Sequence, residues 1–213
     1  MAKILAVDTT ADFGSLALVE NGRVVEELPL HSTDGFSHIL WQHLEPLLAR
    51  HEWRLHDVDC FAAAAGPGSF TGVRVGLTAM KGLADVEGKP AVAVSNLRAI
   101  AWYGVTPLRA AILDARRGEI YGAVYDASGA LRMAEIVSPL PAFVASLAAD
   151  VTECVTQTPE VFHSALPGRL VTAAPRALAG VVGLIAEGMQ WQDPLAVDAN
   201  YVRRSDAELF WKE

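Results

Sequence analysis

The sequence predicts an α/β protein of two lobes, each of which opens with a meander of three antiparallel strands. The prediction rests on a repeated order of elements and on a strand–turn–helix unit in the first half. A strand that ends in aspartate, a short turn and a return strand occur around Asp8 and again around Asp114. The repeat is weak in sequence and consistent in element order, which indicates an internal duplication. We place the N-terminal lobe at residues 1–104 and the C-terminal lobe at residues 105–213.

The N-terminal meander is predicted from short apolar runs and a strong hairpin signal. Asn21-Gly22 is typical of a two-residue turn between antiparallel strands. Asp8, with Thr9 beside it, ends the first strand and has two interpretations. It could hold a metal–phosphate group, as in actin-like and ribonuclease H-like enzymes, or form an Asx turn with its own backbone. The three strands are expected at residues 3–10, 15–19 and 24–30.

A helix is expected from Ser37 to about residue 50, with Ser37 as its N-cap and a kink at Pro46. Its apolar side chains share one stripe, as the helical period requires. They are Ile39, Leu40, His43, Leu44, Leu47 and Leu48.

A glycine-rich turn follows a buried strand predicted at residues 59–64. Gly66 and Gly68 are expected to allow positive φ, and Ser69 or Thr71 to cap the helix that runs on to about residue 85. The turn either requires glycine for its shape alone or holds an anion or a carbonyl at the helix N-terminus.

The helix after this turn contains Gly72, Gly76 and Gly82. A glycine inside a helix costs up to ~1 kcal/mol relative to alanine, so these positions predict a close approach by a neighbouring helix or a ligand. The apolar positions of the same helix are Val73, Leu77 and Met80. A parallel strand is then expected at residues 90–94.

The second lobe repeats the meander. A strand at residues 110–114 is followed by a turn that carries Arg116 and Arg117, and a return strand follows at residues 119–125. The remaining elements are a third strand at residues 131–136, a helix near 142–149, short strands near 154 and 170, and a helix at 176–190.

Composition excludes several classes of protein. Apolar residues make up 52% of the 213 residues, so a large core is expected and wholesale disorder is not. The net charge of −8 and the lack of a basic stripe argue against a protein that grips nucleic acid alone. The two cysteines show no metal-binding spacing, and no apolar run approaches the ~18 residues of a membrane helix. A cytoplasmic protein without membrane contact is therefore expected.

Two such lobes are typical of the actin-like, sugar-kinase and Hsp70-like architecture, the ribonuclease H-like or ASKHA fold. Six segments then occur in one order along nearly the whole chain, and together they resemble the TsaB (YeaZ) family. They lie at residues 4–10, 66–76, 80–84, 94–97, 113–121 and 201–203.

The resemblance implies a part in adding a threonylcarbamoyl group to the adenosine beside the anticodon of tRNAs that read codons starting with A. In that family the protein is not the transferase. It assembles with the related TsaD, which carries the metal and transfers the group, and with the ATPase TsaE. Alone it forms a homodimer. Contact with tRNA is then expected only through the complex.

The loss of a metal site supports this division of labour. TsaD carries a histidine pair after the corresponding strand, and here Asn96 and Ile100 stand at those two positions. An amide is a poor ligand for iron or zinc, and isoleucine cannot ligate at all. No metal and no catalytic residue are therefore expected. The alternative is a small-molecule kinase or ATPase of the same fold.

Three groups of candidate site residues follow. The partner interface is expected on the two helices, at Ile39, Leu40, His43, Leu44, Leu47, Val73, Leu77 and Met80. The alternative is that these apolar residues lie in the core of the monomer. A degenerate nucleotide cleft would contain Asp8, Thr9, Gly66, Gly68, Ser69, Asp114 and Arg116. Contacts to tRNA or a partner are expected at Tyr201, Arg203 and Arg204. No cofactor of its own is expected, although ATP or ADP could bind at a partner interface.

Overall fold

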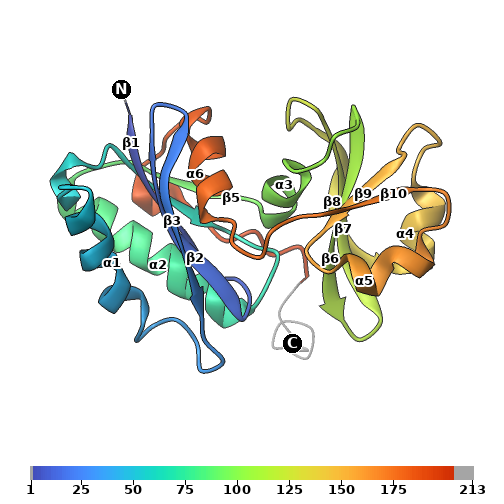
Figure 1. Cartoon of the computed structure of the whole chain (residues 1–213), viewed down its shortest axis with the longest axis horizontal. Coiled ribbons are helices and arrows are strands. Elements are labelled where there is room, and N and C mark those ends of the chain that lie inside the picture. Colours follow the sequence, from blue (N-terminus) through green and yellow to red (C-terminus); the bar gives the residue numbers. More distant parts are fainter. Residues whose placement is uncertain (1, 204–213) are drawn as a thin grey trace, which may run out of the picture. The chain divides into compact units, whose positions relative to one another are not determined.

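The computed structural model describes residues 2–203 of the chain, which form two compact units (Figure 1). The first unit contains the residues up to Asn96 together with Arg176–Ala199. The second contains Leu97–Pro175 and the described residues from Asn200 onward. This division differs from a single boundary at residue 104, because a late helix returns to the first unit.

The first unit is built on a five-stranded sheet in the order β3-β2-β1-β4-β5. The first three strands pair antiparallel with one another, and β4 and β5 extend the sheet in parallel with β1. Asn21 and Gly22 both adopt positive φ (54° and 71°), as the predicted hairpin turn requires. The strands are β1 (Lys3–Asp8), β2 (Phe13–Glu20), β3 (Arg23–His31), β4 (Cys60–Ala64) and β5 (Ala91–Val94).

Helices cover both faces of this sheet (Figure 1). Strand residues such as Leu5 and Leu16 pack in one core with the apolar residues of α1 and α2. On the other face, Val19 lies against Gly183 of α6. The helices are α1 (Leu40–Arg50), α2 (Phe70–Glu87) and α6 (Ala179–Glu187), with 3₁₀ turns η1 (Leu55–Asp57) and η3 (Pro194–Ala196).

The start of α1 differs from the prediction. The helix begins at Leu40 and its N-cap is Ile39, which makes no side-chain cap, so Ser37 does not cap it. Pro46 does lie inside the helix.

Hydrogen bonds to side chains of β2 and β3 hold the start of α6 against the first unit. The helix has no side-chain cap of its own at Leu178. Instead, the backbone N–H of Ala179 donates to Ser15 Oγ (2.9 Å) and that of Gly180 donates to Glu27 Oε1 (2.9 Å). Ser15 Oγ also donates to the same Glu27 oxygen (2.8 Å). Side chains more than 150 positions earlier in the sequence thus satisfy N–H groups at the start of the helix.

The second unit repeats the topology of the first. Its sheet has the order β10-β9-β6-β7-β8. Read from the other edge, β8-β7-β6-β9-β10 corresponds strand by strand to β3-β2-β1-β4-β5, which confirms the duplicated meander. Phe143, Leu147 and Phe162 fill a core against this sheet. The elements are β6 (Leu108–Arg116), β7 (Glu119–Asp126), β8 (Leu131–Pro139), β9 (Glu153–Thr156), β10 (Leu170–Ala173), α3 (Asn96–Ala101), α4 (Leu140–Ser146), α5 (Pro159–Phe162) and η2 (His163–Ala165).

Candidate functional site

The glycine turn has the predicted strand–turn–helix form. Ser69 is the N-cap of α2, and its Oγ accepts a hydrogen bond from the backbone N–H of Gly72 (3.3 Å). Gly66 has a φ of 98°, which only glycine adopts readily. Gly68 is not at positive φ and is required for another reason, because an added Cβ would lie 2.6 Å from the carbonyl oxygen of Thr10.

The glycines of α2 bring the helix against the end of β1. A Cβ added at Gly72 would lie 2.0 Å from Thr9 O, and one added at Gly76 would lie 2.6 Å from Thr9 Oγ1. Thr9 Oγ1 donates to Gly72 O (2.7 Å), which fixes this approach. The close contact predicted from Gly72 and Gly76 is therefore made to the chain's own strand. Gly82 differs, since nothing lies within 4 Å of an added Cβ.

A buried polar network ties Asp8 to the glycine turn. Asp8 Oδ1 accepts from the backbone N–H of Thr10 (2.9 Å) and from Thr10 Oγ1 (2.6 Å). The Asn96 amide donates to Thr10 Oγ1 (2.6 Å), and its Oδ1 accepts from Gly66 N–H (2.8 Å). Asp8 and Asn96 are each 2% exposed. Of the two interpretations of Asp8, the geometry shows the Asx turn.

Burial raises the pKa of the Asp8 carboxyl from 3.8 to about 6, and the nearby charge of Glu27 adds to this, while bonds from Thr10 and Asn96 oppose it. Because the pKa is higher in the folded chain, stability falls as pH rises through this range and Asp8 ionises. Above pH 6, the ionised carboxyl lowers the free energy of unfolding by about 3 kcal/mol relative to its value at a pH where Asp8 is protonated in both states. We therefore expect Asp8→Asn, which can still accept from Thr10, to be more stable than the wild type at pH 8, by roughly 1–3 kcal/mol.

Urea unfolding of both proteins at pH 4.5 and pH 8 measures this difference. The gain at pH 8 should shrink strongly at pH 4.5, where the wild-type carboxyl is protonated. An equal effect of the substitution at both pH values would show that Asp8 does not titrate in this way.

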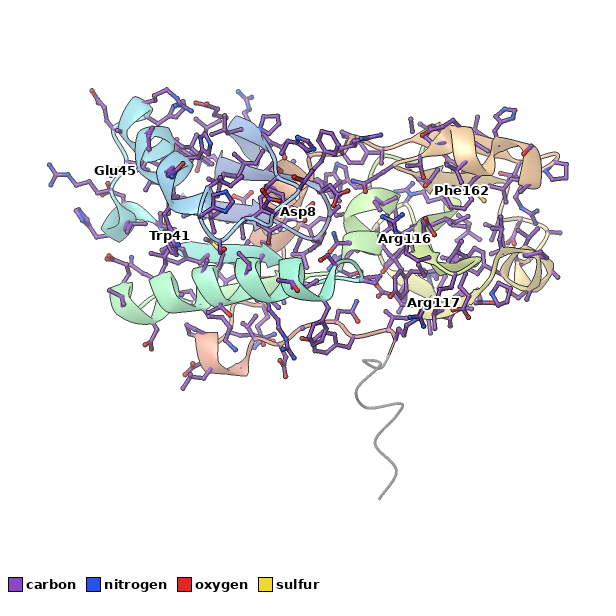
Figure 2. All side chains as sticks on the ribbon, turned by 90° about the horizontal axis from the view of Figure 1, so that it is seen from below. Asp8, Trp41, Glu45, Arg116, Arg117 and Phe162 are labelled. Atoms are coloured by element: carbon purple, nitrogen blue, oxygen red, sulfur yellow. The ribbon has the colours of Figure 1, made fainter. Side chains whose placement is uncertain are left out.

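The second meander places Asp114 in a similar turn. Asp114 Oδ1 accepts from the backbone N–H of Arg116 (2.7 Å), the same relation as between Asp8 and Thr10. Arg116 and Arg117 both adopt positive φ (64° and 58°), which is costly for a residue with a side chain. Both side chains are exposed at this turn between β6 and β7 (Figure 2).

The end of the described chain packs on the second unit. Arg203 Nη1 donates to Ala115 O (2.8 Å), and Nη2 forms an ion pair with Glu119. Arg203 is thus engaged within its own unit, whereas Tyr201 is 47% exposed. Arg204 lies outside the described residues.

The predicted partner interface requires a correction. Six of its eight residues are 6% exposed or less, and they fill the core of the first unit. The physical reason is that one face of a five-stranded sheet is wide enough to bury the stripes of both helices. The six are Leu40, Leu44, Leu47, Val73, Leu77 and Met80. Of the remaining two, Ile39 is partly buried against the same core and His43 is exposed.

The outer surface of the same helices is an apolar groove, which we call the α1–α2 groove. Its volume is about 740 Å³. Large apolar side chains in it are open to solvent: Trp41 is 49% exposed, Phe70 42% and Val86 82%. Figure 2 shows Trp41 on α1 beside α2. The groove is lined by Ser37, Leu40, Trp41, Phe70, Thr71, Arg74, Val75, Thr78, Ala79, Gly82, Leu83 and Val86.

A second hollow adjoins the groove and shares Trp41 and Leu83 with it. Its volume is about 470 Å³, and Glu45 and Trp53 are among the residues that line it. Apolar surface of this extent on two adjacent helices is typical of a protein–protein contact.

Neither residue at the positions of the TsaD histidine pair is able to bind a metal ion. Ile100 is fully buried, and the Asn96 amide is engaged by Gly66 and Thr10. Within residues 2–203, no group of three or more His, Cys, Asp or Glu side chains is placed to hold a metal ion. None of the helices in this described part is long and apolar enough to cross a membrane.

Comparison with known proteins identifies relatives of the chain. The family described as "TsaD: tRNA N6-adenosine threonylcarbamoyltransferase" matches residues 28–168. The "tRNA threonylcarbamoyladenosine biosynthesis protein TsaB" of Escherichia coli K12 is 38% identical over 128 residues, 58% of this chain and 54% of the relative. The protein of the same description from Bacillus subtilis 168 is 35% identical over 124 residues, which are 57% of this chain and 54% of the relative. The chain spans about half the length of the curated relatives it matches.

A solved structure is similar over almost the whole chain. It is a Pseudomonas aeruginosa protein described as uncharacterized, with similarity to the peptidase YeaZ. The TM-score is 0.78 at 25% identity, and the match covers 95% of this chain and all of that one. The predicted two-lobed fold with duplicated meanders is thereby confirmed.

Proposed function

Because the chain belongs to the TsaB (YeaZ) branch of the TsaD family, we propose that it is a non-catalytic subunit that activates a TsaD-type transferase. The product of the complex is threonylcarbamoyladenosine in tRNA, and the ATPase TsaE is its third component. Two bacterial relatives are described as biosynthesis proteins for this nucleoside, which supports the proposal. The place of action is then the cytoplasm.

The observation that carries the proposal is the α1–α2 groove. An activating subunit must present a stable contact surface, and aromatic side chains such as tryptophan and phenylalanine are enriched in such contacts. Trp41 and Phe70 are the large aromatic residues of this groove. The transferase binds here in our proposal, and a second copy of the chain occupies the same surface when the transferase is absent.

The state of the residues expected at a catalytic centre supports a non-catalytic role. A kinase or ATPase of this fold would need the Asp8 carboxylate to reach a metal–phosphate group. Asp8 is instead 2% exposed and bonded to Thr10. Asn96 and Ile100 in place of a histidine pair agree with this interpretation.

Transfer RNA reaches the chain through the complex in this proposal. The chain carries a net charge of −8, so phosphate is repelled at long range. The Arg203 side chain is paired with Glu119 and is not held ready for an anion. If a nucleotide is bound at all, its place is the partner interface.

The proposal is tested by measuring how tightly the chain binds the TsaD homologue of the same genome. We expect Trp41→Glu to weaken this binding by at least about tenfold, because it removes an anchor and buries a charge in the contact. Its melting temperature should stay near that of the wild type, since Trp41 is half exposed. Trp102→Glu is the matched control, because Trp102 is 50% exposed and does not line the groove.

Reconstitution completes this test. The TsaD and TsaE homologues with tRNA should form threonylcarbamoyladenosine in the presence of the chain and lose most of that activity without it. Wild-type affinity of Trp41→Glu for TsaD would rule out the groove as the contact. Sustained ATP turnover by the isolated chain with Mg²⁺ would favour the kinase or ATPase alternative.

A further inference from the structure

The turn between β6 and β7 holds two arginines in a backbone conformation that residues with side chains avoid. Arg116 and Arg117 have φ values of 64° and 58°, and within residues 2–203 they are the one adjacent pair of non-glycine residues at positive φ. Such a conformation is costly and persists where the surrounding contacts impose it. Asparagine or glycine would adopt it at less cost, as Asn21-Gly22 does between β2 and β3. Arginine at these two positions therefore needs a reason beyond the shape of the turn.

Arg203 binds this turn on both sides. Its Nη1 donates to the backbone oxygen of Ala115 (2.8 Å), which precedes the turn, and its Nη2 forms an ion pair with Glu119, which follows it. The guanidinium also lies 5.6 Å from the centroid of the Tyr121 ring on β7. A guanidinium is a planar fork whose N–H groups point in fixed directions, so one side chain holds the ends of the two strands at a set separation.

The segment that carries Arg203 is itself anchored on the same sheet. Asn200 Nδ2 donates to Glu135 Oε2 (2.5 Å) on β8, and Glu135 Oε1 accepts from the hydroxyl of Tyr125 (2.5 Å) on β7. The segment therefore passes from β8 to the β6–β7 turn, which lies more than 80 positions earlier in the sequence than Arg203. Arg203 thus reaches the turn from a fixed position.

Arg116 has a fixed backbone and an exposed side chain. Its backbone N–H donates to Asp114 Oδ1 (2.7 Å), whereas its guanidinium is 3.9 Å from the other oxygen of that carboxylate and its side chain is 82% exposed. An exposed ion pair at such a distance restrains a side chain only weakly. Figure 2 shows Arg116 at the edge of the second unit, beside Arg117. A side chain that is presented to solvent from a supported backbone has the properties of a contact residue.

We propose that Arg203 is a positioning residue, which holds the β6–β7 turn so that Arg116 keeps the place from which it acts in the complex. Without Arg203 the turn can relax to negative φ, and this change redirects the Cα–Cβ bond of Arg116. Arg203 then acts through Arg116 and has no need to contact tRNA or a partner itself. The inference rests on the proposed function, because its effect is read in the activity of that complex.

Hydrogen exchange of the isolated chain tests whether Arg203 holds the turn. Arg203→Met keeps an unbranched side chain and removes every N–H donor from it. We expect exchange of the backbone N–H groups at residues 116–119 to become at least about tenfold faster. Exchange at Ala111 and Ala123, a buried pair in the middle of β6 and β7, should stay within about twofold of the wild type.

The melting temperature and a control variant separate a local effect from a global one. Arg203→Met should lower the melting temperature by less than about 4 °C, because a partly exposed ion pair contributes little to global stability. Arg132→Met removes the exposed partner of Asp126 in the same sheet and should leave exchange at the turn within about twofold of the wild type. Equal acceleration at the turn and in the middle of the strands would show a general loss of stability and would overturn the inference.

Reconstituted formation of threonylcarbamoyladenosine shows whether Arg203 acts through Arg116. With the TsaD and TsaE homologues of the same genome and tRNA, we expect Arg203→Met and Arg116→Gln each to lower the rate about tenfold. The double variant should be within about twofold of Arg116→Gln, because the second change has no side chain left to misplace. Arg132→Met should stay within about twofold of the wild type.

The outcomes distinguish this inference from the proposed function. A loss of about a hundredfold in the double variant would mean that the two effects multiply, so that Arg203 acts independently of Arg116 and the inference is overturned. A wild-type rate for either single variant would overturn it too. If the wild-type chain does not stimulate the homologues at all, the proposed function fails, and with it the role of Arg116 in the complex. Hydrogen exchange needs this chain alone, and it then still decides whether Arg203 holds the turn.

Discussion

We expect Leu77→Arg to unfold the protein, with a loss of about 4 kcal/mol or more in the free energy of unfolding. Leu77 is 6% exposed and belongs to the core that α1 and α2 form on the first sheet. Arginine there would remove packed apolar volume and would place a charge where water and a counter-ion are absent. A domain with a typical stability of about 5–15 kcal/mol would retain little of it.

The neighbouring residue on the same helix is the matched control. Thr78 is exposed on the α1–α2 groove, so Thr78→Arg should change the free energy of unfolding by less than about 0.5 kcal/mol. It should nevertheless impair binding of the partner. Solubility, circular dichroism and thermal melts of the two variants measure the contrast. A soluble Leu77→Arg protein with a wild-type melting temperature would show that Leu77 does not lie in the core.

This pair of variants also shows what the helix patterns could and could not predict. An apolar stripe indicates that a helix is covered, and it does not say whether a sheet or another protein covers it. The stripes that contain Leu44 on α1 and Leu77 and Met80 on α2 are both covered by the chain's own sheet. The useful signal for a contact surface was elsewhere on the same helices, in the large apolar residues Trp41 and Val86 outside the stripe.

The antiparallel meanders and their turns were predictable because their causes are local. Asn21-Gly22 determines a hairpin through two positive φ values, and Ser69 caps α2 three residues before the N–H that it binds. The return of α6 could not be predicted in this way. Its helix start is satisfied by Ser15 and Glu27, and no local pattern identifies partners so distant in sequence.

Asn96 shows the same limit at the candidate site. When the sequence is compared with that of TsaD, Asn96 is seen only as the replacement of a metal-binding histidine. In the structure its amide joins Gly66 of the glycine turn to Thr10 beside β1, so the residue has a structural role of its own. That role depends on three segments that meet only in the folded unit.

We expect Gly72→Ala to destabilise the protein by about 3 kcal/mol or more, even though alanine is the better helix former by up to ~1 kcal/mol. The new Cβ would lie 2.0 Å from the backbone oxygen of Thr9. The helix cannot simply move away, because Thr9 Oγ1 donates to Gly72 O and the N–H of Ser69 donates to Thr10 O (2.7 Å). Relief of the clash would break these bonds and open the contact between α2 and β1.

Gly82→Ala makes the same substitution in the same helix, at a position where nothing lies within 4 Å of the added Cβ. It should stabilise the protein by about 0.5–1 kcal/mol. Urea unfolding of the two variants removes the common gain in helix propensity, so that their difference of about 4 kcal/mol measures the close approach of α2 to β1. If both substitutions stabilise the protein to the same extent, the strand and the helix do not meet at Gly72.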